Sequence, residues 1–127
     1  KDGQFRPDIQ DDLSVKLPGG GLQSTAADLL AFAHAFQNGT LVPMESFAQL
    51  LRDPVDSGVY TQPGWAVFSE PVRGRIIQMD GGQSGTSTVL TIYLDRGIVV
   101  AVLANTSRAS SSVKVIGERL YGIASSE

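Results

Sequence analysis

The 127-residue sequence contains no cysteine and a single histidine, His34. The absence of cysteine excludes a disulfide framework and a thiolate metal site, and one histidine leaves little material for an imidazole-based metal site. Asp8, Asp11 and Asp12 lack the regular alternation and the glycine of a calcium loop, so we expect them to form a solvated acidic loop. His34 is expected to be a solvated residue on a helix surface.

Basic clusters and long apolar runs are absent as well. The net charge is −3 and no basic cluster stands out, which argues against a nucleic-acid partner. No apolar run approaches the roughly 20 residues of a membrane-spanning helix, and Lys1 does not begin a signal peptide. Because the opening KDGQF has no initiator methionine, we expect the chain to be part of something longer.

What the sequence does contain is typical of a globular domain. Hydrophobic residues make up 42% of the chain and charged residues 18%, a composition that does not indicate disorder. We expect residues 1–127 to form a single domain or a fragment of one. Residues 1–18 are polar and contain two prolines, so they are predicted to be an extended lead-in.

Three helices are predicted. Ser24 or Thr25 can cap the first, which ends at the sequence NGT, residues 38–40. A shorter helix begins at Pro43 and ends near Asp53, and a closing helix covers residues 111–124. The expected buried residues are Leu29, Phe32, Ala33 and Phe36 in the first helix, Phe47, Leu50 and Leu51 in the second, and Val113, Ile116, Leu120 and Ile123 in the third, which should lie on the sheet.

Four segments have strand composition: residues 64–70, 75–79, 87–94 and 97–105, with a tight hairpin signal at 95–97. The predicted fold is α+β, an antiparallel sheet of three to four strands flanked by helices. The last strand is apolar on both faces, like a central strand, yet a simple meander would leave it at the edge. Natural proteins avoid such edges, so we expect the N-terminal part of the same protein, or a second copy, to pair with residues 97–105.

A glycine-rich segment, MDGGQSG, lies between two of these strands. Glycine there indicates either a bulge or turn, or a place where something must approach the backbone closely. By itself the segment favours the bulge or turn. The surrounding sequence pattern instead favours a place where another group approaches the backbone closely.

That pattern resembles the later part of the serine β-lactamase-like superfamily, which includes class C β-lactamases, D-alanyl-D-alanine carboxypeptidases and related esterases. The segments KLPGGGLQSTAADLLAFAHAFQNGTLVP, GW and GGQSGTSTVLTIYLDRGIVVAVLAN match the family's pattern in order and spacing, over about residues 14–121. The resemblance implies the C-terminal part of a β-lactamase/transpeptidase-like fold. It also implies a serine hydrolase that transfers the acyl group of an ester, amide or lactam, with no metal or organic cofactor.

The resemblance further implies a site. The family's Lys/His-Thr-Gly strand motif corresponds to Met79, Asp80 and Gly81, which would bind substrate, and the backbone N–H of Gly82 would be one of two oxyanion donors. Met79 replaces the usual cation or imidazole, and Asp80 replaces a hydroxyl with an acid. Both departures argue against carboxylate-bearing substrates and favour an esterase or a degenerate relative.

The family's nucleophile helix, Ser-x-x-Lys, and its Tyr-x-Asn loop normally lie upstream of this sequence. The one literal Ser-x-x-Lys, Ser111 to Lys114, falls at the start of the closing helix, where serines are ordinary capping residues. The chain alone is therefore expected to be inactive. Its parent would act on a small-molecule or peptidoglycan-like substrate, and family analogy favours a periplasmic or secreted location.

Two alternatives stay open. The fold could have been retained as a non-catalytic binding or assembly module, which Met79 and Asp80 favour, or the chain could be an unrelated α+β domain. An upstream Ser-x-x-Lys and Tyr-x-Asn in the full gene would support the enzyme. For Trp65 the sequence predicts core packing or a pocket wall, and Asn105 is expected to bond a turn rather than take part in catalysis.

Overall fold

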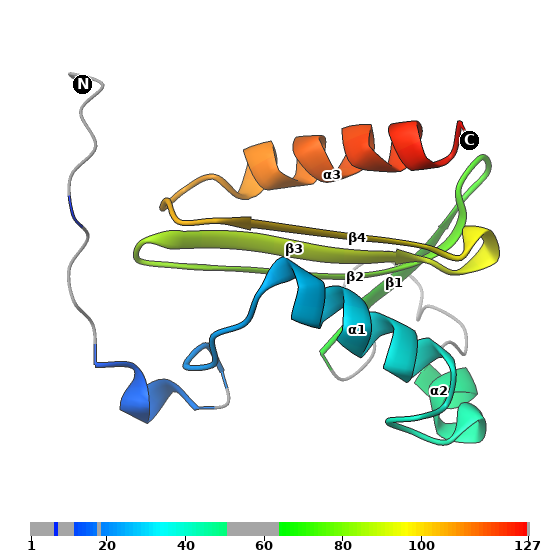
Figure 1. The fold of residues 1–127 in the computed structure, drawn as a ribbon, viewed down its shortest axis with the longest axis horizontal. Helices are drawn as coiled ribbons and strands as arrows, with labels where there is room; N and C mark the ends of the chain where they lie inside the picture. Colours follow the sequence, from blue (N-terminus) through cyan, green and yellow to red (C-terminus); the bar gives the residue numbers. More distant parts are fainter. Residues whose placement is uncertain (1–6, 8–11, 18, 51–63, 127) are drawn as a thin grey trace.

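A computed structural model describes residues 7, 12–17, 19–50 and 64–126. The chain forms a four-stranded antiparallel sheet in the order β1-β2-β3-β4, with α3 on one face and α1 and α2 on the other (Figure 1). This arrangement confirms the predicted α+β class. The elements are η1 Leu13–Lys16, α1 Ala26–Gln37, α2 Met44–Leu50, β1 Ala66–Glu70, β2 Gly74–Gln83, β3 Thr86–Tyr93, η2 Leu94–Arg96, β4 Ile98–Ala104 and α3 Ser110–Ala124.

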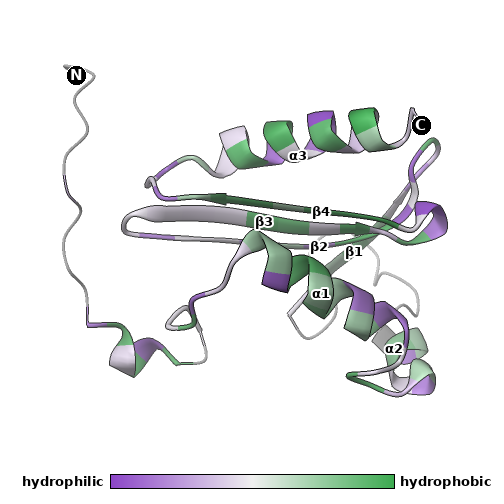
Figure 2. Cartoon of the chain, in the orientation of Figure 1, coloured by the Kyte–Doolittle hydropathy of each residue, from purple (hydrophilic) through white to green (hydrophobic). Residues whose placement is uncertain are grey.

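The sheet separates two apolar clusters, because neighbouring residues of a strand point to opposite faces. On the α1 side, Ile77 and Ile92 pack with Ala33, Phe36 and other buried side chains. On the α3 side lies a second cluster, made by Ile76, Tyr93, Val100 and Tyr121. Both faces of the central strands are therefore buried. Figure 2 shows the corresponding hydrophobic colouring along β4, which is apolar throughout, as the sequence indicated.

Helix α1 begins at a capped end. The Thr25 hydroxyl accepts the Asp28 backbone N–H at 3.1 Å and donates to the Asp28 carboxylate at 2.8 Å. The structure thus selects Thr25 over Ser24 as the cap. We expect Thr25→Ala to lower the free energy of unfolding by about 1 kcal/mol, measured by urea denaturation. Ser24→Ala is the matched control and should change it by less than about 0.5 kcal/mol; equal losses in the two variants would contradict the assignment.

The buried face of α1 agrees in part with the prediction. Ala33 and Phe36 are buried, whereas Phe32 is 41% exposed. Phe32 lies at the edge of the packed face, where its ring stacks on Trp65 at 6.5 Å, and Phe36 stacks on the same indole at 5.7 Å. The sequence predicted core packing or a pocket wall for Trp65, and the structure shows its indole half-buried and packed against the core cluster on the α1 side. His34 is exposed, as expected.

The predicted sheet-facing residues of α3 are largely wrong. Val113 is buried, but Ile116, Leu120 and Ile123 are 46%, 42% and 65% exposed. The residues that meet the sheet are instead Val113, Gly117 and Tyr121. Gly117 lets the helix approach closely: a Cβ there would lie 3.8 Å from Val89 and Val100 side-chain carbons. The Tyr121 ring packs 4.0 Å from that of Tyr93. The prediction followed the spacing of aliphatic residues, so it missed a buried helix face in which glycine and tyrosine make the contacts.

Two smaller expectations are also revised. The lead-in is not extended throughout, because Leu13–Lys16 forms a short 3₁₀ helix whose first turn is capped by the Asp12 carboxylate at 3.0 Å. The second helix begins at Met44, one residue after the predicted start at Pro43, and its Phe47 is buried, as predicted. Three expectations lie outside the described residues: the burial of Leu51, the end of the second helix near Asp53, and the acidic loop at Asp8 and Asp11. The side chain of Leu50 is not described either.

Candidate functional site

Strand β2 is longer than the sequence predicted. It continues past Met79 to Gln83, so the segment expected to separate two strands is itself strand. β1 pairs residues 66–70 with residues 78–74 of β2 and goes no further. Residues 79–83 therefore pair with β3 on one side only. On the other side, no strand formed by the described residues covers them, and β2 presents an open edge there.

The register fixes which backbone groups face this edge. Ser84 and Gly85 form a two-residue hairpin, closed by the pair Gln83–Thr86. The pair that closes such a turn is hydrogen-bonded, and hydrogen-bonded and non-bonded pairs alternate along an antiparallel ladder. Gln83 and Gly81 therefore bond to β3, whereas Asp80 and Gly82 direct their N–H and C=O groups to the open edge. Among the described residues, none hydrogen-bonds to those groups.

An independent contact supports this alternation. Arg75 lies an even number of residues from Gly81 and Gln83 along β2, so its N–H should point to the same side as theirs, toward β3. That N–H donates to the Asp95 carboxylate, at 3.0 Å, in the turn that follows β3. The bond is also the main reason why the pKa of Asp95 lies below its ordinary value.

Among the described residues, no contact or backbone conformation requires glycine at positions 81 and 82. The pairing runs without interruption through Gly81–Thr88 and Gly82–Ser87, so there is no bulge. Neither glycine has a positive φ, whereas Gly85, with φ 78°, is the turn glycine. A Cβ at Gly82 would lie 3.6 Å from Ser110 Oγ, an ordinary contact, and one at Gly81 would lie 3.4 Å from Thr88 Oγ1. The bulge-or-turn alternative is thereby excluded for these two residues.

A groove of about 770 Å³ lies beside the β2–β3 hairpin. One wall is the hairpin, including Gly81 and Gly82, and the other is the segment that leads into α1, including Leu22 and Ser24. The Gln83 side chain ties the two walls together by donating to the Gly20 carbonyl at 3.2 Å. All of the lining side chains are uncharged, so the groove suits a neutral group.

Met79 and Asp80 point to opposite faces of the sheet. Met79 is 39% exposed on the α1 side. Asp80 points toward α3, where its carboxylate lies 3.0 Å from Lys114 Nζ. The acid that the sequence placed beside the site is therefore paired with a lysine of the opposite layer. In the sequence, Lys114 stood out only as the last residue of the Ser-x-x-Lys pattern. No local pattern indicates that it pairs with an acid on β2.

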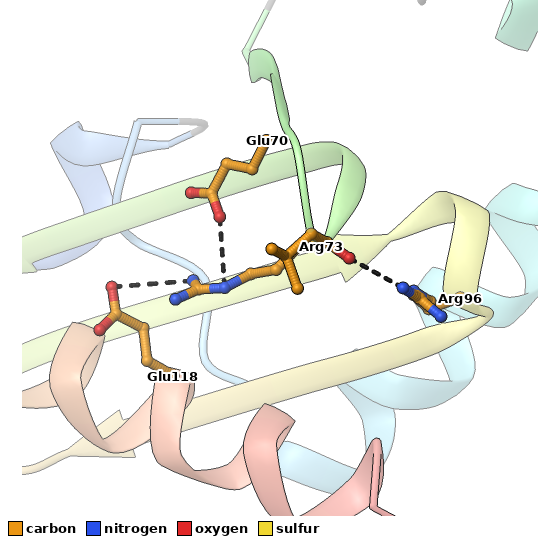
Figure 3. A network of polar contacts seen from close by, with 5 residues as sticks. Glu70, Arg73, Arg96 and Glu118 are labelled. Atoms are coloured by element: carbon orange, nitrogen blue, oxygen red, sulfur yellow. Dashed lines mark hydrogen bonds and ion pairs between the residues drawn. The ribbon is translucent and has the colours of Figure 1, made fainter.

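A second polar network lies at the other end of the sheet, where the β1–β2 turn meets α3 (Figure 3). Arg73 Nε is 3.2 Å from the Glu70 carboxylate, its Nη1 is 4.0 Å from Glu118, and its guanidinium stands 5.7 Å over the Tyr121 ring. Arg96 donates to the Val72 carbonyl at 2.8 Å. These contacts fasten the turn to its neighbours and lie far from the open edge of β2.

Tyr93 is buried within the same layer. Burial raises the pKa of its phenol above the usual 10.0, outweighing the opposite effect of Arg73. The folded state thus holds this proton more tightly than the unfolded state. We expect the free energy of unfolding to fall as the pH rises past about 10, and Tyr93→Phe to make that fall smaller. Urea denaturation between pH 8 and pH 11 measures it; an identical fall in the variant would contradict this.

The described residues contain no group of three or more histidine, cysteine, aspartate or glutamate side chains that could hold a metal ion. No described helix is long and apolar enough to cross a membrane. The candidate site is therefore built from backbone groups, neutral side chains and one ion pair.

Comparisons with known proteins agree with this fold. A family model described as Beta-lactamase matches residues 1–120. The crystal structure of a penicillin-binding protein from Bacillus halodurans superposes with a TM-score of 0.61 at 21% identity, over 76% of this chain and 30% of that one. The chain thus spans less than a third of that protein's length. No curated protein matches. From the extent of the family match, the chain belongs to the Beta-lactamase family.

Proposed function

We propose that this chain forms one wall of the acyl-transfer site of a longer serine hydrolase. In this proposal the Gly82 N–H is one oxyanion donor, and Met79, Asp80 and Gly81 line the bound substrate. The observation that carries it is the open edge of β2, toward which Gly82 directs an N–H that no described residue binds. Membership of the Beta-lactamase family supports a hydrolase of this kind.

Acyl transfer needs a hydrogen-bond donor such as the Gly82 N–H. When a nucleophile attacks an ester, amide or lactam carbonyl, negative charge develops on the oxygen, and a fixed N–H aimed at it stabilises the transition state. A strand holds its N–H in place through the neighbouring ladder bonds, here those of Gly81 and Gln83 to β3. Glycine at 81 and 82 has no role in the fold itself, which is consistent with a need for close approach from outside.

The surroundings favour an uncharged substrate group. Met79 offers no cation to a carboxylate, the adjoining groove has no charged side chain, and the charge of Lys114 is matched by Asp80 at 3.0 Å. A neutral acyl or leaving group of a small ester, amide or lactam fits these conditions better than an anionic one. A peptidoglycan-like substrate would have to place an uncharged portion here.

The nucleophile would come from outside these residues. The sequence has no Tyr-x-Asn, and its one Ser-x-x-Lys begins α3, with Lys114 already paired to Asp80. The test is hydrolysis of a p-nitrophenyl ester and of nitrocefin by the longer gene product and by the 127-residue chain. We expect turnover by the former and none by the latter. An inactive longer product without Ser-x-x-Lys would favour the binding or assembly module instead.

A further inference from the structure

The first turns of α3 lie alongside the open edge of β2. A Cβ on Gly82 would lie 3.6 Å from Ser110 Oγ, and the Asp80 carboxylate lies 3.0 Å from Lys114 Nζ. Ser110 and Lys114 are about 6 Å apart along the helix axis, and Gly82 and Asp80 are about 7 Å apart along the strand. Because the two spacings match, Ser110 stands over Gly82 and Lys114 stands over Asp80.

This arrangement brings a cation to the α3 side of the edge. The side chains of Lys114 and Asp80 are 39% and 24% exposed, so solvent reaches the pair, and Ser110 is exposed beside it. A lysine ammonium has three donors on a flexible stem. Without Asp80 it would attract a carboxylate bound next to Gly82. Asp80 belongs to the same fold, so it competes with any free carboxylate at a high effective concentration.

From this geometry we infer that Asp80 sets the charge selectivity of the edge. Its carboxylate acts as a built-in competitor for Lys114, so the site rejects a substrate that has a carboxylate near the reacting carbonyl. A neutral residue at position 80 would release Lys114 and, with Ser110, create a subsite for such a group. The inference rests on the proposed function, because it takes the reacting carbonyl to lie at the Gly82 N–H.

The alternative is that the ion pair only fastens β2 to α3. Partly exposed ion pairs contribute little to stability, and this part of β2 is already held by its ladder with β3. The nearest acid along α3, Glu118, is one turn beyond Lys114. It lies 4.0 Å from Arg73 and therefore has a cation of its own. A Lys114 released from Asp80 is thus available to a ligand.

A kinetic test uses the longer gene product and two esters that differ in one charge, 3-acetoxybenzoate and its methyl ester. The quantity measured is the ratio of kcat/KM for the acid to that for the methyl ester. Asp80→Asn should raise this ratio at least about 10-fold, the order expected of one hydrogen bond to a charged group. Lys114→Met should lower it, because the acid stays and its cation is gone.

The double variant, Asp80→Asn with Lys114→Met, is the matched control. It removes both charges, so its ratio should return to within about 3-fold of the wild-type ratio. Loss of a merely structural contact would instead affect the two esters alike, and would do so in both single variants. Opposite changes in the two single variants therefore distinguish charge selectivity from a structural role.

A binding test needs no turnover. Nuclear magnetic resonance follows the Gly82 amide of the longer product during titration with benzoate and, separately, with benzamide. Asp80→Asn should bind benzoate at least about 10-fold more tightly than wild type does, whereas the affinity for neutral benzamide should be the same in both proteins. If the longer product is inactive yet gains benzoate binding in this way, charge selection by Asp80 holds and the proposed hydrolysis does not.

Two results would overturn the inference. In an active longer product, an ester ratio that stays the same in Asp80→Asn, or that moves in one direction in both single variants, would show that Asp80 does not select by charge. Equal benzoate affinities of wild type and Asp80→Asn would show the same, whether or not the protein hydrolyses esters.

Discussion

Gly82→Pro in the longer protein is expected to lower kcat for ester hydrolysis by about 100- to 1000-fold, the range found when one oxyanion donor is removed. Proline lacks the N–H, and at this position the N–H faces the open edge of β2 rather than the ladder. Proline is tolerated in edge strands at such places. The loss should therefore appear in kcat, with the melting temperature nearly unchanged.

The control is Gly82→Ala, which keeps the N–H. A Cβ at this position would lie 3.6 Å from Ser110 Oγ, so it fits without rearrangement. The added methyl group crowds the close approach to this edge but leaves the donor in place, so we expect the alanine variant to lose clearly less activity than the proline variant. Steady-state kinetics with a p-nitrophenyl ester, together with thermal melts, decides the matter. A proline variant as active as wild type would remove Gly82 from the oxyanion site, and equal losses in both variants would point to steric effects instead.

Ile92→Ala is expected to have the largest effect on stability. Ile92 is fully buried in the cluster between the sheet and α1, beside Ile77 and Phe36. Removing its outer carbons leaves a cavity in the packed layer, and such changes cost about 2–5 kcal/mol. Because whole domains are stable by only about 5–15 kcal/mol, this loss brings the chain near unfolding.

The matched control is Ile123→Ala in the 127-residue chain. Ile123 is 65% exposed, so the same chemical change should alter the free energy of unfolding by less than about 0.5 kcal/mol. Urea denaturation of wild type and both variants under one set of conditions gives the two differences. If Ile92→Ala cost less than about 1 kcal/mol, the cluster on the α1 side would not be the packed core described above.

Local sequence signals were sufficient for much of the fold. The alternation and turn residues around Asp95 to Gly97 predicted the β3–β4 connection, and the apolar spacing after a serine or threonine cap predicted α1. The position of β4 at the edge also followed from chain order alone. These features depend on neighbours in sequence, and therefore a single sequence reveals them.

Features that depend on packing between layers were not predictable. The buried face of α3 includes Gly117 and Tyr121. The spacing of aliphatic residues does not mark these two as core residues, so the prediction placed the wrong side of the helix against the sheet. The extension of β2 through Asp80 and Gly82 became evident only from the register with β3. The ion pair of Asp80 with Lys114 joins residues far apart in sequence, and neither residue type alone indicates it.

The most direct test of the central proposal is a crystal structure of the longer protein inactivated by a p-nitrophenyl phosphonate, whose phosphorus oxygen stands in for the oxyanion. The proposal predicts that the Gly82 backbone nitrogen lies about 2.7–3.1 Å from that oxygen, along the open edge of β2. An inhibitor bound to its serine with the oxygen held by other donors, and Gly82 left without a contact, would contradict it.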